Sequence, residues 1–262
     1  MSAQRNSDSV PAASSSSWQS ARLLVTDEFA APPVILRVGD SVIGTLGNFS
    51  ASTGKAKSKK TFNVCAIVAA AMTGGTVLNY SASLPPRKRR ILYVDTEQSR
   101  FHCKRVLCRI LRLAGLPTDA HPPLLEFLCL RGYATKERLR KIEEAIYDLD
   151  NLGLVVIDGI RDLAHDINSP GEATDLITKL MQWTDERRIH IHTVLHLNKG
   201  DDNTRGHLGT ELNNKAETVL QITKDDFERD ISSVAAMHIR DRDFEPFAFR
   251  INADGLPELK HQ

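Results

Sequence analysis

Short apolar runs alternate with longer amphipathic segments along the chain from about residue 34. Five runs contain mostly apolar residues and lack the strict alternation of strands that are exposed on one face. Such runs are typical of strands buried on both faces of a sheet. They are SVIGTLGNFSA (41–51), RRILYVDTE (89–97), LLEFLCLRG (124–132), GLVVIDGI (153–160) and IHIHTVLHL (189–197).

Between these runs lie four segments whose apolar residues recur at helical spacing. They are KTFNVCAIVAAAMT (60–73), SRFHCKRVLCRILRLAG (99–115), TKERLRKIEEAIYDLD (135–150) and EATDLITKLMQWTDERR (172–188). Strands and helices that take turns in this way predict an α/β fold with a mostly parallel sheet flanked by helices.

The pattern changes after residue 215, where alternating stretches are broken by short polar turns. These stretches, KAETVLQITKDD, SSVAAMHIRDRD and EPFAFRINADG, are typical of antiparallel strands. We therefore expect C-terminal hairpin strands that extend the parallel sheet.

Composition indicates one main domain. The chain has 262 residues, of which 41% are hydrophobic and 26% are charged, which is enough for one large core. We expect a disordered Ser-rich tail over residues 1–22 and a single domain over residues 23–262. The N-terminus lacks the features of a secretory signal, and no segment has the apolar run of a membrane helix, so we expect a cytoplasmic protein without a membrane partner.

The net charge and the cysteines further limit the kinds of site that the chain can have. The formal net charge of +1 gives no overall argument for nucleic-acid binding, so any such surface must be local. One basic cluster, Lys55, Lys57, Lys59 and Lys60, occurs within six residues. The four cysteines form no CxxC pair, which favours free thiols packed in the core over a disulfide framework or a zinc site.

This basic cluster overlaps a phosphate-binding pattern. In STGKAKSKKTFN (53–64), Gly54, Lys60 and Thr61 have the spacing of GxxxxGK[ST], but Lys59 replaces the second glycine. The segment follows a predicted strand and opens a predicted helix, which is the context that such a loop requires. We expect ATP as the ligand, with Lys60 on its β- and γ-phosphates and Thr61 on Mg²⁺. The predicted cofactor-binding residues are Gly54, Lys55, Ala56, Lys57, Ser58, Lys59, Lys60, Thr61 and Phe62.

Lys59 leaves two interpretations open. A side chain at this position can clash with the loop or resist its backbone angles, and the segment would then be a solvated lysine-rich loop. If the backbone can adopt the turn, the lysine instead adds a positive charge beside a polyanion.

Two further strands end in carboxylates. GLVVIDGI ends near Asp158, where a nucleotide-binding α/β domain needs a carboxylate for the Mg²⁺ site. RRILYVDTE delivers Asp95 and Glu97 to the same edge, where a carboxylate can orient or deprotonate a water molecule. Glu97 is the better candidate for the base, because Asp95 is better placed to hold the neighbouring backbone. The alternatives are an ordinary turn-capping aspartate at 158 and solvent-facing charges at 95 and 97.

Together these motifs resemble the RecA-like P-loop ATPase core, and more narrowly the hexameric replicative-helicase and plasmid or mobile-element ATPases related to RepA. The resemblance runs from about Pro33 to Pro257. It implies Glu97 as catalytic base, Asp158 as the Walker B metal ligand, a homo-oligomeric ring, and single-stranded DNA as a partner. The implied function is ATP hydrolysis in replication or mobilisation of a plasmid or mobile element, with helicase activity as one form of it.

Two later segments match this resemblance. TVLHLNKGDDNTRGHLGTE begins in the predicted strand 189–197 and continues into a Gly-rich polar loop. The resemblance implies His196 or Asn198 as a γ-phosphate sensor, and Lys199 and Arg205 in a DNA-contacting loop. A plain surface loop is the alternative. In HIRDRDFEPFAF the resemblance implies that Arg240 and Arg242, on one face of a predicted strand, act as fingers on a neighbouring subunit's nucleotide. Ion pairs with the interleaved Asp241 and Asp243 are the alternative.

Other functional classes have less support. A rival hypothesis is a catalytically weak RecA-like module that binds nucleotide or DNA and recruits partners. A small-molecule kinase is less favoured, because the chain has no Arg-rich insertion that could form a lid. Neither GxGxxG after a strand nor GxSxG occurs in the sequence. His190, His192 and His196 alternate on one predicted strand, but zinc sites built on a single strand are uncommon.

Overall fold

The computed structural model describes residues 18–197 and 206–260. The chain divides into two units, Met1–Ala31 and Pro32–Gln262. Within the described part of the first unit, a short 3-10 turn at Gln19–Ala21 is followed by a segment without regular structure. Residues 1–17 of the predicted tail lie outside the described residues, so the domain boundary at residue 23 stays a prediction.

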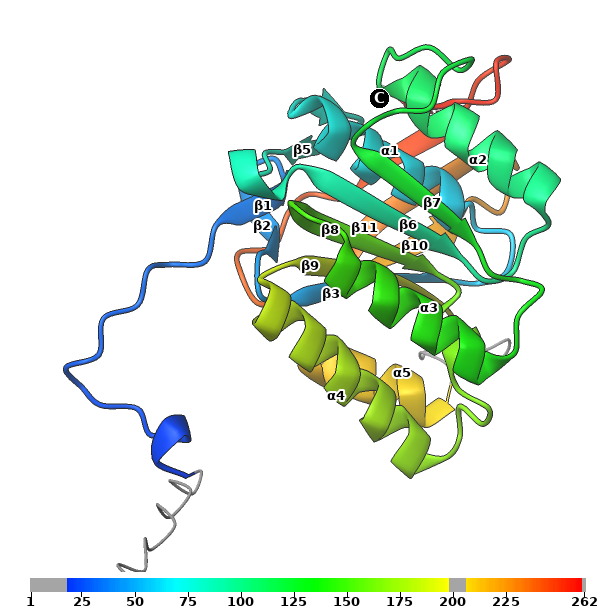
Figure 1. The fold of residues 1–262 in the computed structure, drawn as a ribbon. Helices are drawn as coiled ribbons and strands as arrows, with labels where there is room; N and C mark the ends of the chain where they lie inside the picture. Colours follow the sequence, from blue (N-terminus) through cyan, green and yellow to red (C-terminus); the bar gives the residue numbers. More distant parts are fainter. Residues whose placement is uncertain (1–17, 198–205, 261–262) are drawn as a thin grey trace, which may run out of the picture. The chain divides into compact units, whose positions relative to one another are not determined.

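The second unit is built on a nine-stranded sheet with the order β13-β12-β11-β10-β3-β9-β8-β6-β7. The six strands from β10 to β7 in this order are parallel, and β11, β12 and β13 extend the sheet in antiparallel fashion. This arrangement confirms the predicted fold class (Figure 1). The strands are β3 Phe49–Gly54, β6 Arg90–Asp95, β7 Leu125–Cys129, β8 Leu152–Asp158, β9 His190–His196, β10 Thr218–Lys224, β11 Ile231–Ile239, β12 Phe247–Ile251 and β13 Pro257–Leu259.

Helices cover both faces of this sheet (Figure 1). One face carries α1 and α2, and the other carries α3, α4 and α5, with a separate buried apolar cluster on each side. The helices are α1 Lys60–Thr73, α2 Arg100–Leu113, α3 Thr135–Asp148, α4 Pro170–Arg187 and α5 Gly206–Lys215. Short 3-10 turns also occur at Pro86–Lys88 and Ile160–Leu163.

One predicted strand is wrong. The run 41–51 contains two strands, β2 Ser41–Thr45 and β3 Phe49–Gly54, which belong to different sheets. The chain turns at Gly47, whose φ of 88° favours glycine. A small antiparallel sheet with the order β2-β1-β5-β4 therefore packs beside α1, and it was not predicted. Its other strands are β1 Val34–Val38, β4 Thr76–Val77 and β5 Tyr80–Ala82.

Two more elements differ from the prediction. β7 lies at the edge of the main sheet, and only its first residue, Leu125, is fully buried, so this strand is not enclosed on both faces. α5 forms where the sequence indicated an extended polar loop, because Leu208 and Leu212 bury one face of this short helix. Among the described residues, no helix has both the length and the apolar character needed to cross a membrane.

Candidate functional site

The carboxyl ends of the parallel strands bring the predicted site residues together. Strand register pairs Gly54 with His196 and Asp95 with Asp158, at the end of four adjacent strands. A cleft of 360 Å³ opens at this edge between the β3–α1 loop and α2. Its lining includes Lys57, Ser58, Lys59, Lys60, Thr61, Phe62, Glu97, Gln98, His102, Arg105, Arg109, Asp158 and His196.

The β3–α1 loop turns tightly despite its missing glycine. Lys59 adopts a left-handed conformation with φ 66° and ψ 29°, and its Nζ donates to the Arg229 carbonyl oxygen at 2.7 Å. The side chain therefore leaves the loop toward the β10–β11 hairpin instead of blocking it. A Cβ at Gly54, by contrast, would lie 2.3 Å from the Ile222 carbonyl oxygen, so this glycine is required by close packing.

Lys60 lies at the start of α1 and is only 5% exposed. Its Nζ donates to the Gly54 and Lys55 carbonyl oxygens at 2.8 and 2.9 Å. Burial lowers the pKa of Lys60 to about 8, an effect that the charges of Asp158 and Glu97 partly offset. The ammonium group is thus held inside the loop and remains mostly protonated at neutral pH.

The donors of the loop suit an anion. The first N–H groups of α1, like those of any helix, have no partner within the helix. The N-cap residue, Lys59, supplies no side-chain acceptor for them. Ser58 Oγ is also buried without a hydrogen-bond partner among the described residues. Unpaired N–H groups at a helix start, a buried hydroxyl and an ammonium group together form a site that fits phosphate.

Thr61 and Asp158 form an oxygen site beside Lys60. Thr61 Oγ1 and Tyr93 Oη each donate to Asp158 Oδ2 at 2.9 Å. Burial, with the nearby Asp95 charge, raises the pKa of Asp158 to about 6. A hydroxyl and a carboxylate are hard oxygen donors of the kind that Mg²⁺ prefers, so this pair fits the predicted metal site.

Asp95 and Glu97 have different environments. Asp95 is buried, and its carboxylate accepts hydrogen bonds from the Glu97 and Gln98 backbone N–H groups at 3.0 and 2.7 Å. It therefore holds the turn after β6. Glu97 faces the cleft with its Oε1 3.6 Å from His196 Nε2. The neighbouring His196 lowers the pKa of Glu97 against the effect of burial, which keeps Glu97 ionised at neutral pH.

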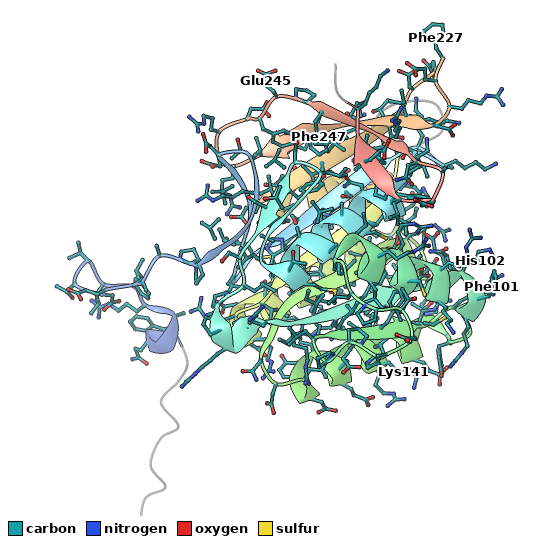
Figure 2. The ribbon with its side chains drawn as sticks, turned by 90° about the horizontal axis from the view of Figure 1, so that it is seen from above. Phe101, His102, Lys141, Phe227, Glu245 and Phe247 are labelled. Atoms are coloured by element: carbon teal, nitrogen blue, oxygen red, sulfur yellow. The ribbon has the colours of Figure 1, made fainter. Side chains whose placement is uncertain are left out.

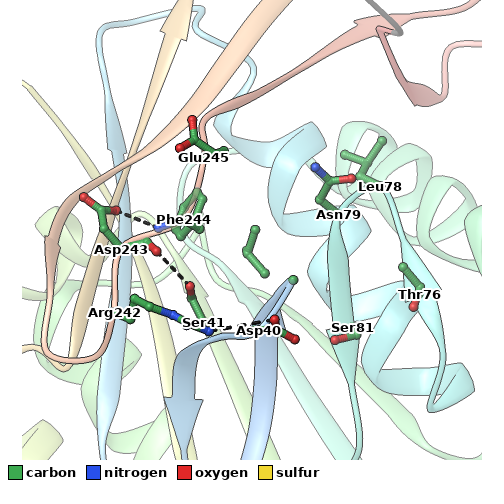
Figure 3. Close-up of a pocket in the computed structure, with 12 residues that line it drawn as sticks. Asp40, Ser41, Thr76, Leu78, Asn79, Ser81, Arg242, Asp243, Phe244 and Glu245 are labelled. Carbon is green, nitrogen blue, oxygen red and sulfur yellow. Dashed lines mark hydrogen bonds and ion pairs between the residues drawn. The ribbon is translucent and has the colours of Figure 1, made fainter.

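The two predicted finger residues lie outside this cleft. β11 ends at Ile239, which pairs with Thr218 at the amino end of β10, so Arg240 and Arg242 lie in a loop at the opposite edge of the sheet. The prediction that both share one face of a strand is therefore wrong. Arg242 lines a separate pocket of 680 Å³, with its Nη2 3.8 Å from Asp40 Oδ2 (Figure 3).

The remaining candidates divide into two groups. Asn198, Lys199 and Arg205 lie outside the described residues. His190 and His192 point into the core, where their ring nitrogens bond to the Ser50 hydroxyl at 2.7 and 2.8 Å. No group of three metal-binding side chains occurs in the described part of the chain.

The sequence interpretation missed the wall that α2 contributes. His102, Arg105 and Arg109 line the cleft, and the Arg109 guanidinium lies 3.8 Å from the centre of the Phe62 ring. Phe101 and His102 project outward from the first turn of α2 (Figure 2). These basic residues recur at intervals of three and four, which is the one signal that could have placed them on the face toward the loop.

Comparisons with known proteins bear on the family and the fold of the chain. A family model described as an AAA domain matches residues 20–202. None of the curated proteins matches the sequence. The crystal structure of the RadB recombinase is similar over 80% of this chain and 90% of that chain, with a TM-score of 0.54 and 16% identity. At this identity the likeness shows the fold alone, and it is the predicted RecA-like fold.

Proposed function

The chain belongs to the AAA domain family, and on that premise we propose that it binds and hydrolyses ATP in the cleft beside the β3–α1 loop. One observation carries the proposal. The Thr61 hydroxyl and the Asp158 carboxylate come from segments 97 residues apart, yet they meet at 2.9 Å beside the buried Lys60 ammonium. Strand-end carboxylate, loop lysine and helix-start hydroxyl are the parts that P-loop nucleotide hydrolysis uses.

Binding follows from the donors of the loop. The β- and γ-phosphates would accept hydrogen bonds from the first N–H groups of α1 and from Lys60, which exchanges its two carbonyl partners for phosphate oxygens. Thr61 and Asp158 would hold Mg²⁺. The bound ion would neutralise charge on the β- and γ-phosphates. Arg105 and Arg109 add positive charge on the opposite wall.

Glu97 is the proposed base for hydrolysis. Its carboxylate is ionised at neutral pH and faces the cleft, so it can orient a water molecule and accept its proton. The water oxygen bonds to the γ-phosphorus while the bond to the bridging oxygen breaks, and ADP and phosphate leave. His196 Nε2 lies 3.6 Å from Glu97 Oε1, which supports a role for His196 as the sensor of the γ-phosphate.

We further propose that the active form is a homo-oligomeric ring. Arg240 and Arg242 do not reach the cleft of their own chain, so any role on a nucleotide requires a neighbouring subunit. The resemblance to RepA-type and replicative-helicase ATPases supports a role in replication or mobilisation of a plasmid or mobile element, with single-stranded DNA as partner.

The test is ATP turnover by the full chain, with and without single-stranded DNA. Lys60→Ala should lower turnover by about 10²-fold or more, because the lost ammonium stabilises charge that develops on the phosphates. Lys136→Ala, on the exposed face of α3, is the matched control and should keep the full rate. Stimulation by DNA that disappears in Lys60→Ala would support the DNA role. Equal turnover in Lys60→Ala and the unaltered chain would overturn the hydrolysis proposal.

The same assay at falling protein concentration tests the ring. If Arg240 or Arg242 acts across subunits, the rate per subunit should fall as the assembly dissociates. A demonstrably monomeric sample that keeps the rate of the assembled protein would refute the finger role.

A further inference from the structure

Two cysteines that are far apart in the sequence lie in contact. Cys103 occupies the first turn of α2, and Cys129 is the last residue of β7. Their Sγ atoms are 3.3 Å apart. No sequence motif marks this pair, because the two residues are separated by 26 positions and belong to no CxxC motif.

The thiol pair packs under the turn that carries Glu97. Both Sγ atoms lie 3.5 Å from the Gln98 carbonyl oxygen. Cys129 is also the strand partner of Asp95, the carboxylate that holds the Glu97 and Gln98 backbone N–H groups. Any movement of the two sulfurs therefore acts directly on the segment between β6 and α2.

The surroundings of the pair permit a covalent bond. A disulfide has an S–S length of about 2.05 Å, so the sulfurs must approach by roughly 1.3 Å from their 3.3 Å contact. β7 is the edge strand of the sheet and is hydrogen-bonded on one side only. Cys129 is partly exposed on this edge, while Cys103 is only 3% exposed, so a small oxidant reaches Cys129 first.

We propose that Cys103 and Cys129 form a reversible disulfide, and that this bond displaces the turn that carries Glu97. With hydrogen peroxide as oxidant, the Cys129 sulfur attacks one peroxide oxygen and becomes a sulfenic acid, releasing water. The Cys103 sulfur then attacks the Cys129 sulfur, the S–S bond forms, and the hydroxyl leaves with the Cys103 proton as a second water. A dithiol reductant restores both thiols.

Electrostatics set the order of these steps. Burial, together with the neighbouring thiol and the Asp95 carboxylate, raises the pKa of Cys103. Cys103 is therefore a poor first nucleophile, so the partly exposed Cys129 is the residue that meets the oxidant.

The effect on activity rests on the proposed function. Closing the S–S bond draws the first turn of α2 toward the end of β7 and shifts the Gln98 carbonyl between them. Glu97, the residue before Gln98, would lose its alignment with the attacking water. The phosphate loop is not part of this contact, so nucleotide binding should change less than turnover.

The experiment treats the full chain with hydrogen peroxide and maps its peptides without reduction. The expected result is a Cys103–Cys129 link, a mass lower by two hydrogen atoms, and several-fold lower ATP turnover that dithiothreitol restores. Cys103→Ser and Cys129→Ser should each prevent the link. Cys108→Ser, a matched change of a half-buried cysteine on α2, should leave the link and the response intact.

The readouts separate this proposal from the proposed function. Peptide mapping needs no activity, so a mapped link in a chain without turnover contradicts ATP hydrolysis but supports the disulfide. Oxidation that yields no Cys103–Cys129 link, or links either residue to Cys65 or Cys108, overturns the disulfide. A complete link that leaves turnover unchanged overturns its action on Glu97.

Discussion

At the scale of single residues, Lys59 decides how the phosphate loop differs from its usual pattern. A left-handed backbone costs an L-residue roughly 1–2 kcal/mol, which a glycine at this position would avoid. Lys59 offsets part of this cost with its hydrogen bond to the Arg229 carbonyl oxygen and with the nearby Asp230 charge. The lysine therefore links the loop to the β10–β11 hairpin, whose tip carries the fully projecting Phe227 (Figure 2).

Replacing Lys59 by glycine tests whether this loop is a working variant. Lys59→Gly removes the backbone strain and the hairpin contact together, so the unfolding free energy should change by no more than about 1 kcal/mol. ATP turnover should stay the same or fall, because the loop loses a fixed contact. A large rise from near zero would instead identify the natural loop as a disabled site and favour the partner-recruiting module.

Single residues also show how far sequence reasoning reaches. Gly54, Lys60, Thr61 and Asp158 were placed by motif spacing and by the rule that parallel strands end at one edge. Arg105 was not, because the rotation of α2 about its axis depends on tertiary packing. A local pattern likewise could not show that β11 ends before Arg240, since this end is set by pairing with β10.

At the scale of elements, β3 and β9 share a buried polar chain. The Ser50 hydroxyl bonds to His190 and His192, and His192 also bonds to the Ser52 hydroxyl at 2.8 Å. Burial and the neighbouring His190 lower the pKa of His192 to about 3. These two central strands are therefore joined by neutral histidines as well as by backbone hydrogen bonds.

The neutral histidine makes stability depend on pH. Between about pH 6.5 and pH 3, the unfolded chain binds a proton at His192 and the folded chain does not. This contribution is complete above pH 6.5 and is lost as pH falls, by up to about 1.4 kcal/mol per pH unit. Urea unfolding at pH 7 and pH 5 should show a smaller loss for His192→Gln than for the unaltered chain. Equal losses in both would contradict the buried neutral state.

Elements differ in how well the sequence predicts them. The predicted segment 60–73 coincides with α1. The loop lysine, Lys60, marks its start, and Gly74 marks its end. The pattern of residues 41–51 predicts one strand, because the turn at Gly47 interrupts its apolar character only briefly. The pattern does not predict α5, because only two leucines, Leu208 and Leu212, mark the apolar face of this short helix.

At the scale of the whole molecule, a nine-stranded sheet gathers side chains from four strand ends into one cleft. Parallel topology brings Gly54, Asp95, Asp158 and His196 to the same edge, and α2 closes the cleft with basic residues. The fold class was predictable because strands and helices alternate along the chain. The small second sheet was not, because its strands are short and its two hairpins join through the pairing of β1 with the distant β5.

Thermal unfolding with Mg²⁺ and ATP shows whether this cleft binds ATP through the loop between β3 and α1. A ligand at about 100 times its Kd stabilises the folded state by about 2.7 kcal/mol, which raises the Tm of a chain of this size by roughly 5–10 °C. The Tm should rise by this amount in the unaltered chain and in Lys136→Ala, and little or not at all in Lys60→Ala. A Tm that saturating ATP leaves unchanged in the unaltered chain would mean that this loop does not bind ATP.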